Sequence, residues 1–80
     1  MLMPTKHIKT ENALIGVGGE VLALLDRDKT VSRLFYDLQD RRRLNKLTTI
    51  HFDWFLLALD FLFSVGAIRF DSGVVKKMNQ

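Results

Sequence analysis

The chain has 80 residues, a net charge of +3 and no cysteine, and 48% of its residues are hydrophobic. This length allows one domain with a small core, and the lack of cysteine excludes disulfides and thiolate metal sites as supports for that core. The composition indicates an ordered globular protein rather than a disordered or polybasic tail. We expect it to work in the reducing cytoplasm, since no signal-peptide pattern follows Met1.

Residues 1–10 form a short apolar and basic segment that we expect to be an edge strand. Pro4 restricts this segment to an edge or to an irregular start, because proline has no N–H group to donate to a neighbouring strand.

A first helix is predicted from Asn12 to Asp26, where apolar residues recur at helical spacing. Glycines interrupt it, and each costs about 1 kcal/mol relative to alanine in a helix interior. They indicate either a close approach of another helix or a break. A phosphate-binding loop is not expected, because the G-x-G-x-x-G spacing and the P-loop lysine are both missing. The apolar residues are Leu14, Val17, Val21, Leu22 and Leu25, and the glycines are Gly16, Gly18 and Gly19.

A second helix begins after Thr30, whose hydroxyl is suited to cap the free N–H groups of the first turn. The residues expected to face the core are Val31, Leu34, Phe35 and Leu38, and those expected to face solvent are Arg33, Asp37 and Asp40. This helix ends in a basic cluster, defined as Arg41, Arg42, Arg43 and Lys46. Such a cluster either contacts phosphates or faces solvent, where cations favour the C-terminal end of a helix.

The most apolar segment runs from Phe52 to Ile68 and is predicted to be a helix that ends at Gly66. Its apolar residues occupy two opposite faces, with a polar strip of Asp53, Asp60 and Ser64 between them. One face holds Phe52, Phe55, Leu56, Leu59, Leu62 and Phe63, and the other holds Trp54, Leu57, Ala58, Phe61 and Val65. A domain of this size can cover one such face with its own elements, whereas covering two is difficult.

The second face of this helix has two interpretations. Either the chain buries it, with Trp54 as an ordinary core residue, or it binds another protein. The partner-binding residues would then be Trp54, Leu57, Phe61 and Val65, with Trp54 as the anchor, because aromatic side chains bury a large area with few rotatable bonds. Membrane insertion is not expected, since the segment is shorter than the roughly 20 residues needed and contains Asp60.

The chain ends in an expected hairpin, in which Asp71-Ser72-Gly73 forms the turn. The predicted fold is therefore mainly α with a small β-hairpin, and a single domain similar to a winged helix-turn-helix. It would comprise the edge strand over residues 1–10, three helices over 11–66 and a wing hairpin over 67–78.

The residues give little support for catalysis, and we expect no catalytic, cofactor-binding or metal-binding site. His7 and His51 stand apart from any ligand pattern. In a DNA-reading winged helix the third helix presents Arg, Lys, Asn or Gln to the bases, whereas here it presents apolar and acidic residues, which disfavours sequence-specific reading. Nonspecific phosphate contact remains open for Arg41, Arg42, Arg43, Lys46, Arg69, Lys76 and Lys77.

Four blocks of sequence span nearly the whole chain. They are Pro4-Thr5-Lys6-His7-Ile8, Leu14-Ile15-Gly16 continuing to Leu22, Thr30-Val31-Ser32-Arg33-Leu34-Phe35, and Phe52-Asp53-Trp54-Phe55 through Leu57-Ala58-Leu59-Asp60 to Gly66-Ala67-Ile68. In these blocks the chain resembles the small middle components, of the sixth type, of bacterial ABC three-component systems, which accompany SMC- or Rad50-like ATPases in Lamassu-like anti-phage defence.

The resemblance implies a non-catalytic adaptor that links an SMC- or Rad50-like ABC ATPase to an effector, often a nuclease, in an anti-phage or anti-plasmid defence complex. The basic cluster would then support DNA that passes through the ATPase or pair with acids on a partner. The residues leave two alternatives open. One is a small DNA-binding regulator that contacts phosphates through Arg41, Arg42 and Arg43, and the other is a homodimeric structural protein that uses the aromatic face against itself.

Overall fold

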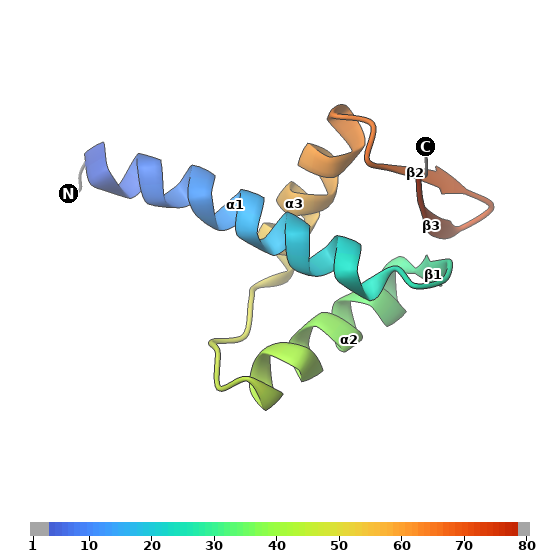
Figure 1. Ribbon diagram of the computed structural model, residues 1–80, viewed down its shortest axis with the longest axis horizontal. Helices are drawn as coiled ribbons and strands as arrows, with labels where there is room; N and C mark the ends of the chain where they lie inside the picture. The colour runs from blue at the N-terminus through green and yellow to red at the C-terminus, as the bar shows by residue number, and fades with distance from the viewer. Residues whose placement is uncertain (1–3, 79–80) are drawn as a thin grey trace.

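The computed structural model describes residues 4–78, with side chains for residues 13–78. Three helices, α1 (Pro4–Leu24), α2 (Val31–Leu44) and α3 (Phe52–Ser64), combine with three short strands, β1 (Lys29–Thr30), β2 (Ile68–Asp71) and β3 (Val74–Lys77). The strands form one antiparallel sheet in the order β1-β3-β2. Figure 1 shows α1 crossing the other two helices, with the sheet beyond its C-terminal end. The mainly α fold with a small hairpin is confirmed, while the winged helix-turn-helix assignment stays a prediction.

The N-terminal segment is helical, which corrects the edge strand predicted over residues 1–10. Residues 1–3 lie outside the described residues, and α1 begins at Pro4. Proline suits the first turn of a helix, because its fixed φ is already helical and its missing N–H would have no partner there. The helix therefore starts well before the predicted Asn12, and it ends at Leu24 rather than at Asp26.

The third strand of the sheet comes from the connection between α1 and α2. Lys29 and Thr30 pair with Val75 and Val74 of β3. Sequence analysis did not find β1, because an alternation of apolar and polar residues cannot show in a strand of 2 residues. Lys29 Nζ also donates a hydrogen bond to Asp37 Oδ2 at 2.7 Å, so β1 is tied to α2.

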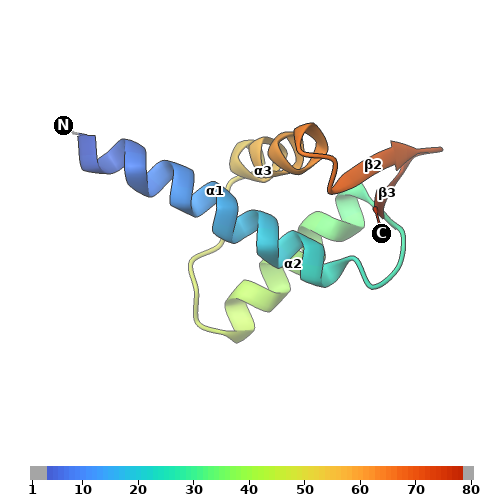
Figure 2. The same cartoon turned by 45° about the horizontal axis from the view of Figure 1, so that its top comes forward.

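The glycines of α1 do not break the helix. A Cβ added at Gly18 would lie 3.2 Å from Leu62 Cδ2 of α3, whereas one at Gly16 or Gly19 would meet nothing within 4 Å. The close helix approach that the glycines indicated is therefore confirmed at Gly18. The crossing of α1 over α3 is visible from two directions in Figures 1 and 2.

The predicted start of α2 and the predicted end of α3 are confirmed. Thr30 Oγ1 accepts a hydrogen bond of 3.1 Å from the N–H of Arg33, which caps α2. After α3, Gly66 adopts a φ of +78°, and the Ala67 N–H donates to the Leu62 carbonyl at 2.8 Å. This is a Schellman ending, which favours glycine because its left-handed conformation carries no Cβ penalty.

The predicted hairpin is also confirmed. Asp71 of β2 pairs with Val74 of β3, and the two residues between them, Ser72 and Gly73, have φ values of +54° and +83°. Positive φ at both positions matches the twist of the flanking strands in a tight hairpin.

The core draws on all three helices and on two strands. Its buried members are Val17, Val21, Leu25, Leu34, Leu38, Phe55, Ala58, Leu62, Ile68 and Val75. In α2, Leu34 and Leu38 are buried as predicted, and Val31 and Phe35 are half-buried. The connection between α2 and α3 is held by Gln39, whose side chain donates to the Ile50 carbonyl at 2.6 Å and accepts from the Ile50 N–H at 2.9 Å.

Substitutions at two glycines of α1 should have opposite effects on stability. We expect Gly19→Ala to raise the free energy of unfolding by about 1 kcal/mol, because alanine is the better helix former and its Cβ meets open space. Gly18→Leu should lower it by about 2 kcal/mol, because the new side chain displaces Leu62 from the helix crossing. Urea unfolding followed by circular dichroism measures both, and equal effects would contradict the assigned crossing.

Asp37 is half-buried, whereas the sequence predicts that it faces solvent. Its side chain is 25% exposed, 2.7 Å from Lys29 Nζ and 3.6 Å from Arg33 Nη1. The hydrogen bond from Lys29, opposed by partial burial, lowers the pKa of Asp37 from its ordinary value of 3.8. A carboxyl whose pKa is lower in the folded state stabilises the fold above its unfolded pKa, and loses that contribution as the pH falls through the folded pKa.

The variant Asp37→Asn should therefore be less stable than the wild type by about 1 kcal/mol at pH 7, with the difference shrinking below about pH 4. Urea titrations across this range measure it. Asp40→Asn is the matched control, since the Asp40–Arg43 pair is exposed and should contribute less than about 0.5 kcal/mol. An undiminished difference between Asp37→Asn and the wild type well below the folded pKa would contradict the ion-pair assignment.

Candidate protein-docking surface

The orientation of α3 decides which apolar side chains remain exposed. The buried residues of this helix are Phe55, Ala58 and Leu62, which follow i, i+3, i+7 spacing and therefore share one side of the helix. Phe55 and Leu62 come from one of the two predicted apolar faces and Ala58 from the other. The core side of α3 thus lies between those faces, and each of them is only partly covered. The polar strip of Asp53, Asp60 and Ser64 is exposed.

The residues predicted to bind a partner do not form a continuous exposed face. Trp54 and Phe61 are half-buried, and a Cβ added at Gly18 would lie 3.7 Å from the Phe61 ring, which places Phe61 beside α1. Leu57 and Val65 are 49% and 61% exposed. The participation of these residues in partner binding stays a prediction.

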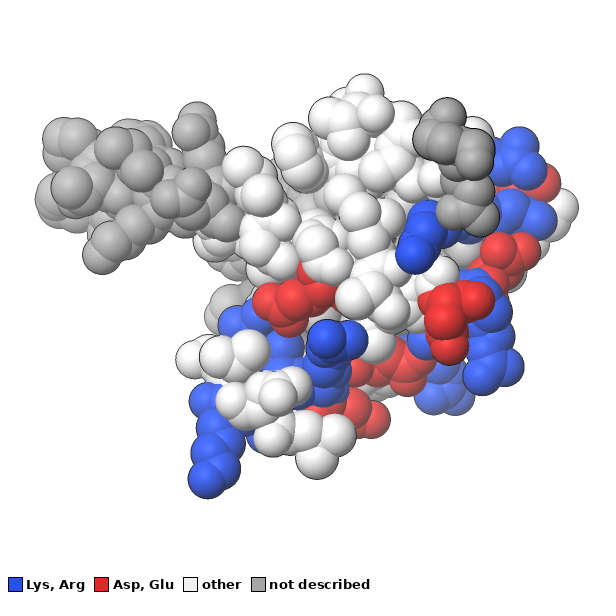
Figure 3. All heavy atoms as spheres, in the orientation of Figure 1, with Lys and Arg blue, Asp and Glu red and all other residues white. Residues whose placement is uncertain are grey.

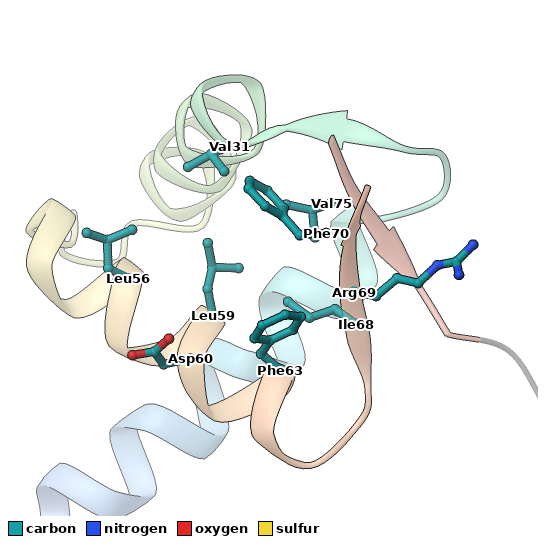
Figure 4. A pocket seen from close by; sticks show the side chains of 9 residues that line it. All are labelled: Val31, Leu56, Leu59, Asp60, Phe63, Ile68, Arg69, Phe70 and Val75. Carbon is teal, nitrogen blue, oxygen red and sulfur yellow. The ribbon is translucent and has the colours of Figure 1, made fainter. Parts of the chain in front are cut away.

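A groove lies between α3 and the sheet, and we call it the α3–β2 groove (Figure 4). Its volume is about 340 Å³, and it is lined by Val31, Leu56, Leu59, Asp60, Phe63, Ile68, Arg69, Phe70 and Val75. Ile68 and Val75 belong to the core and are buried at its base. The walls carry large exposed apolar side chains, since Leu56 is 40%, Phe63 54% and Phe70 57% exposed.

Sequence analysis missed this groove for two reasons. Leu56 and Phe63 belong to the apolar face that also supplies Phe55 and Leu62 to the core, so they carry no separate signal of exposure. Ile68 and Phe70 are two residues apart in the hairpin and share one face of the sheet. That pattern alone does not show that Ile68 is covered by the helices while Phe70 extends beyond them. An exposed apolar cluster around a groove is typical of a protein-binding surface.

The basic residues predicted to contact phosphates fall into two groups. Arg42 is structural, because its Nη1 donates to Glu20 Oε2 of α1 at 2.6 Å and its Nε donates to the Thr48 carbonyl. Lys76 Nζ lies 3.1 Å from Asp28 Oδ2, and Arg43 Nη2 lies 2.6 Å from Asp40 Oδ1 in an exposed pair. The remaining residues, Arg41, Lys46, Arg69 and Lys77, are exposed.

Charged and apolar side chains gather on different parts of the surface. In Figure 3 uncharged atoms cover the upper part, over α3, whereas blue and red atoms cover the lower and right-hand parts, over α2 and the end of the sheet. Positive and negative side chains alternate there instead of forming a patch of one sign, which is the arrangement expected of internal ion pairs rather than of an extended phosphate-binding surface.

The family of the chain is shown by its sequence. A family model described as "ABC-three component (ABC-3C) system Middle Component 6" matches residues 3–79. The chain therefore belongs to the sixth family of middle components of ABC three-component systems, as the resemblance implied. The comparisons with curated proteins and with solved structures gave no match.

Two properties of the described residues bear on other kinds of site. No helix in residues 4–78 is long and apolar enough to cross a membrane. Within the same part of the chain, no three or more His, Cys, Asp or Glu side chains are grouped so that they could hold a metal ion.

Neighbouring arginines of the basic cluster should differ in their effect on stability. Arg42→Ala should lower the free energy of unfolding by about 1 to 2 kcal/mol, because it leaves Glu20 and the Thr48 carbonyl without their charged partner. Arg41→Ala removes the same charge from an exposed position and should change stability by less than about 0.5 kcal/mol. Thermal unfolding at equal ionic strength compares the two, and equal losses would show that Arg42 has no special structural role.

Proposed function

We propose that this chain is a non-catalytic adaptor subunit that connects an SMC- or Rad50-like ABC ATPase to an effector, a nuclease, in a Lamassu-like defence complex against phages or plasmids. It would act in the cytoplasm, where it would hold its two partners through protein–protein contacts. The observation that carries the proposal is the match of the middle-component family over residues 3–79. A middle component implies the other components of its system, an ABC ATPase and an effector.

The surface of the chain supports an adaptor role. Leu56, Phe63 and Phe70 expose large apolar side chains around one groove, and aromatic residues at the centre of an interface supply much of its binding energy. Leu57 and Val65 add exposed apolar area elsewhere on α3 and at its end. Exposed apolar side chains at more than one place suit a small protein that must hold two partners.

Contact with DNA inside the complex is a second proposal, and it involves fewer basic residues than the sequence suggested. The exposed Arg41, Arg43 and Lys46 lie around the C-terminal end of α2, where they could touch phosphates without a sequence preference. Arg42 is excluded from this set by its contacts with Glu20 and Thr48. A test of DNA binding should therefore replace Arg41, Arg43 and Lys46 together and retain Arg42.

Co-expression with the ABC ATPase and the effector of the same system tests the adaptor proposal. We expect the chain to elute with both partners as one complex during size exclusion. The matched control omits the chain, and the ATPase and the effector should then elute separately, because the adaptor is what connects them.

Two outcomes would overturn the adaptor proposal. The first is an ATPase–effector complex that forms equally well without the chain. The second is a chain that elutes alone at 9.2 kDa and binds DNA with an affinity that falls steeply with salt, as a regulator would.

A further inference from the structure

One edge of the small sheet is free. The strand order β1-β3-β2 leaves one side of β2 without a neighbouring strand within residues 4–78. Figure 2 shows the hairpin of β2 and β3 projecting beyond the helices, with its turn at the far end. In Figure 4 the same strand forms one side of the α3–β2 groove, across from Leu56 and Phe63 of α3. A strand that adds to β2 would therefore meet an open edge beside apolar side chains.

Two residues of β2 direct their backbone groups to the free edge. The Met78 N–H donates to the Ala67 carbonyl at 2.9 Å, so Ala67 and Met78 form a hydrogen-bonded pair of the hairpin. Because such pairs alternate along antiparallel strands, Arg69 also bonds to β3, whereas the N–H and C=O groups of Ile68 and Phe70 point outward. The ladder open to any added strand is short, so side chains must supply most of the binding.

Opposite charges flank Phe70 on the other face of β2. Arg69 and Asp71 each lie one position from Phe70, and side chains alternate along a strand, so both belong to the face opposite to Phe70. Arg69 contributes to the lining of the groove, but its guanidinium points away from the groove in Figure 4. Both charged residues are exposed, and within residues 13–78 neither forms an ion pair. The strand thus carries one charge of each sign, placed evenly about a central aromatic residue.

We propose that β2 pairs with β2 of a second copy of this chain, in antiparallel orientation and centred on Phe70, and that the chain thereby forms a symmetric homodimer. Each Arg69 then lies opposite Asp71 of the second copy. The two Phe70 residues lie opposite each other and exchange both N–H···O=C bonds, because the backbone groups of both face the new ladder. This inference concerns the oligomeric state of the chain and does not rest on the proposed adaptor function.

The charges of β2 select this register over the two neighbouring ones. A symmetric pairing centred on Arg69 would place two arginines opposite each other, and one centred on Asp71 would do the same with two aspartates. Like charges directly opposite each other destabilise a pair of strands, whereas opposite charges stabilise it. Of the three registers, only the one centred on Phe70 forms two contacts between Arg69 and Asp71.

The same register brings the two grooves together. A two-fold axis between antiparallel strands of one sheet is perpendicular to that sheet, so corresponding faces of the two copies lie on the same side. Phe70, which is 57% exposed, therefore meets its symmetric counterpart on the groove side. On that side α3 of each copy carries the exposed Leu56 and Phe63. The second copy would thus cover apolar surface that a chain of 80 residues leaves open.

A second copy suits this edge better than other occupants do. A strand from another protein would need an acid and a base at the positions that match Arg69 and Asp71, whereas β2 already carries both in the order that antiparallel pairing with itself requires. A helix has its backbone groups bonded internally. It would cover the outward groups of Ile68 and Phe70 without bonding to them, which is costly.

Reversal of the two charges tests the register. Arg69→Asp places aspartate opposite Asp71 at two symmetric positions, and Asp71→Arg places arginine opposite Arg69. Each should raise the dissociation constant of the dimer about tenfold or more. The double variant Arg69→Asp/Asp71→Arg restores opposite charges and should return that constant to within about threefold of the wild-type value.

The control for these variants is Lys77→Asp, which makes the same change of charge on β3 and should leave the dissociation constant within about twofold of the wild-type value. Sedimentation equilibrium at low salt measures each constant against the monomer mass of 9.2 kDa. Circular dichroism checks that all four variants remain folded.

Amide hydrogen exchange tests the ladder itself. In a dilute sample the Phe70 amide faces the open edge and should exchange quickly. In a concentrated sample it donates to the Phe70 carbonyl of the second copy, and its exchange should slow about tenfold or more. The Arg69 amide bonds to β3 in both states and serves as the internal reference.

Each other result overturns the proposal. A wild-type chain that stays monomeric up to about 1 mM has no such interface. A dimer that resists both single reversals, or that the double reversal does not restore, uses another surface or another register. A dimer in which the Phe70 amide still exchanges quickly is not joined through β2. All of these results leave the adaptor function standing, because recovery of the ATPase and the effector in one complex tests that function separately.

Discussion

The structure depends on the crossing of α1 over the apolar helix α3. The absence of a side chain at Gly18 lets α1 approach Leu62 closely, and Phe55 packs against Phe35 of α2 with ring centroids 5.1 Å apart. These contacts bury one side of α3. A chain of 80 residues has only a small sheet left to cover the rest, so the side that carries Leu56 and Phe63 remains partly open. The α3–β2 groove is thus a direct result of how the core is made.

Short connections place the second wall of the groove with little freedom. The Schellman ending at Gly66 turns the chain from α3 into β2, and the tight turn at Ser72 and Gly73 returns it as β3. β3 is then held by its pairing with β1. Apart from Val31, the lining of the groove therefore belongs to one continuous segment, residues 56–75.

Charged residues mainly hold elements together in this protein. Lys29 and Asp37 connect β1 to α2, and Arg42 and Glu20 connect α2 to α1. This pairing explains why Arg42 of the basic cluster contributes to the fold while its neighbours are exposed. It also leaves the apolar groove largely free of competing charges, with Asp60 and Arg69 as the charged residues in its lining. The groove is therefore mainly apolar.

Features that depend on nearby residues could be predicted from the sequence: the helical spacing of α2 and α3, the cap at Thr30, the helix end at Gly66 and the turn at Gly73. The sequence also carried the family. It did not determine the strand β1, whose 2 residues are too few to show a pattern, or the helical start at Pro4, which suits a strand edge and a first helical turn equally well. The covered side of α3 could not be predicted in this way, because apolar residues occur around most of that helix and the side that is buried depends on where α1 and the sheet pack against it.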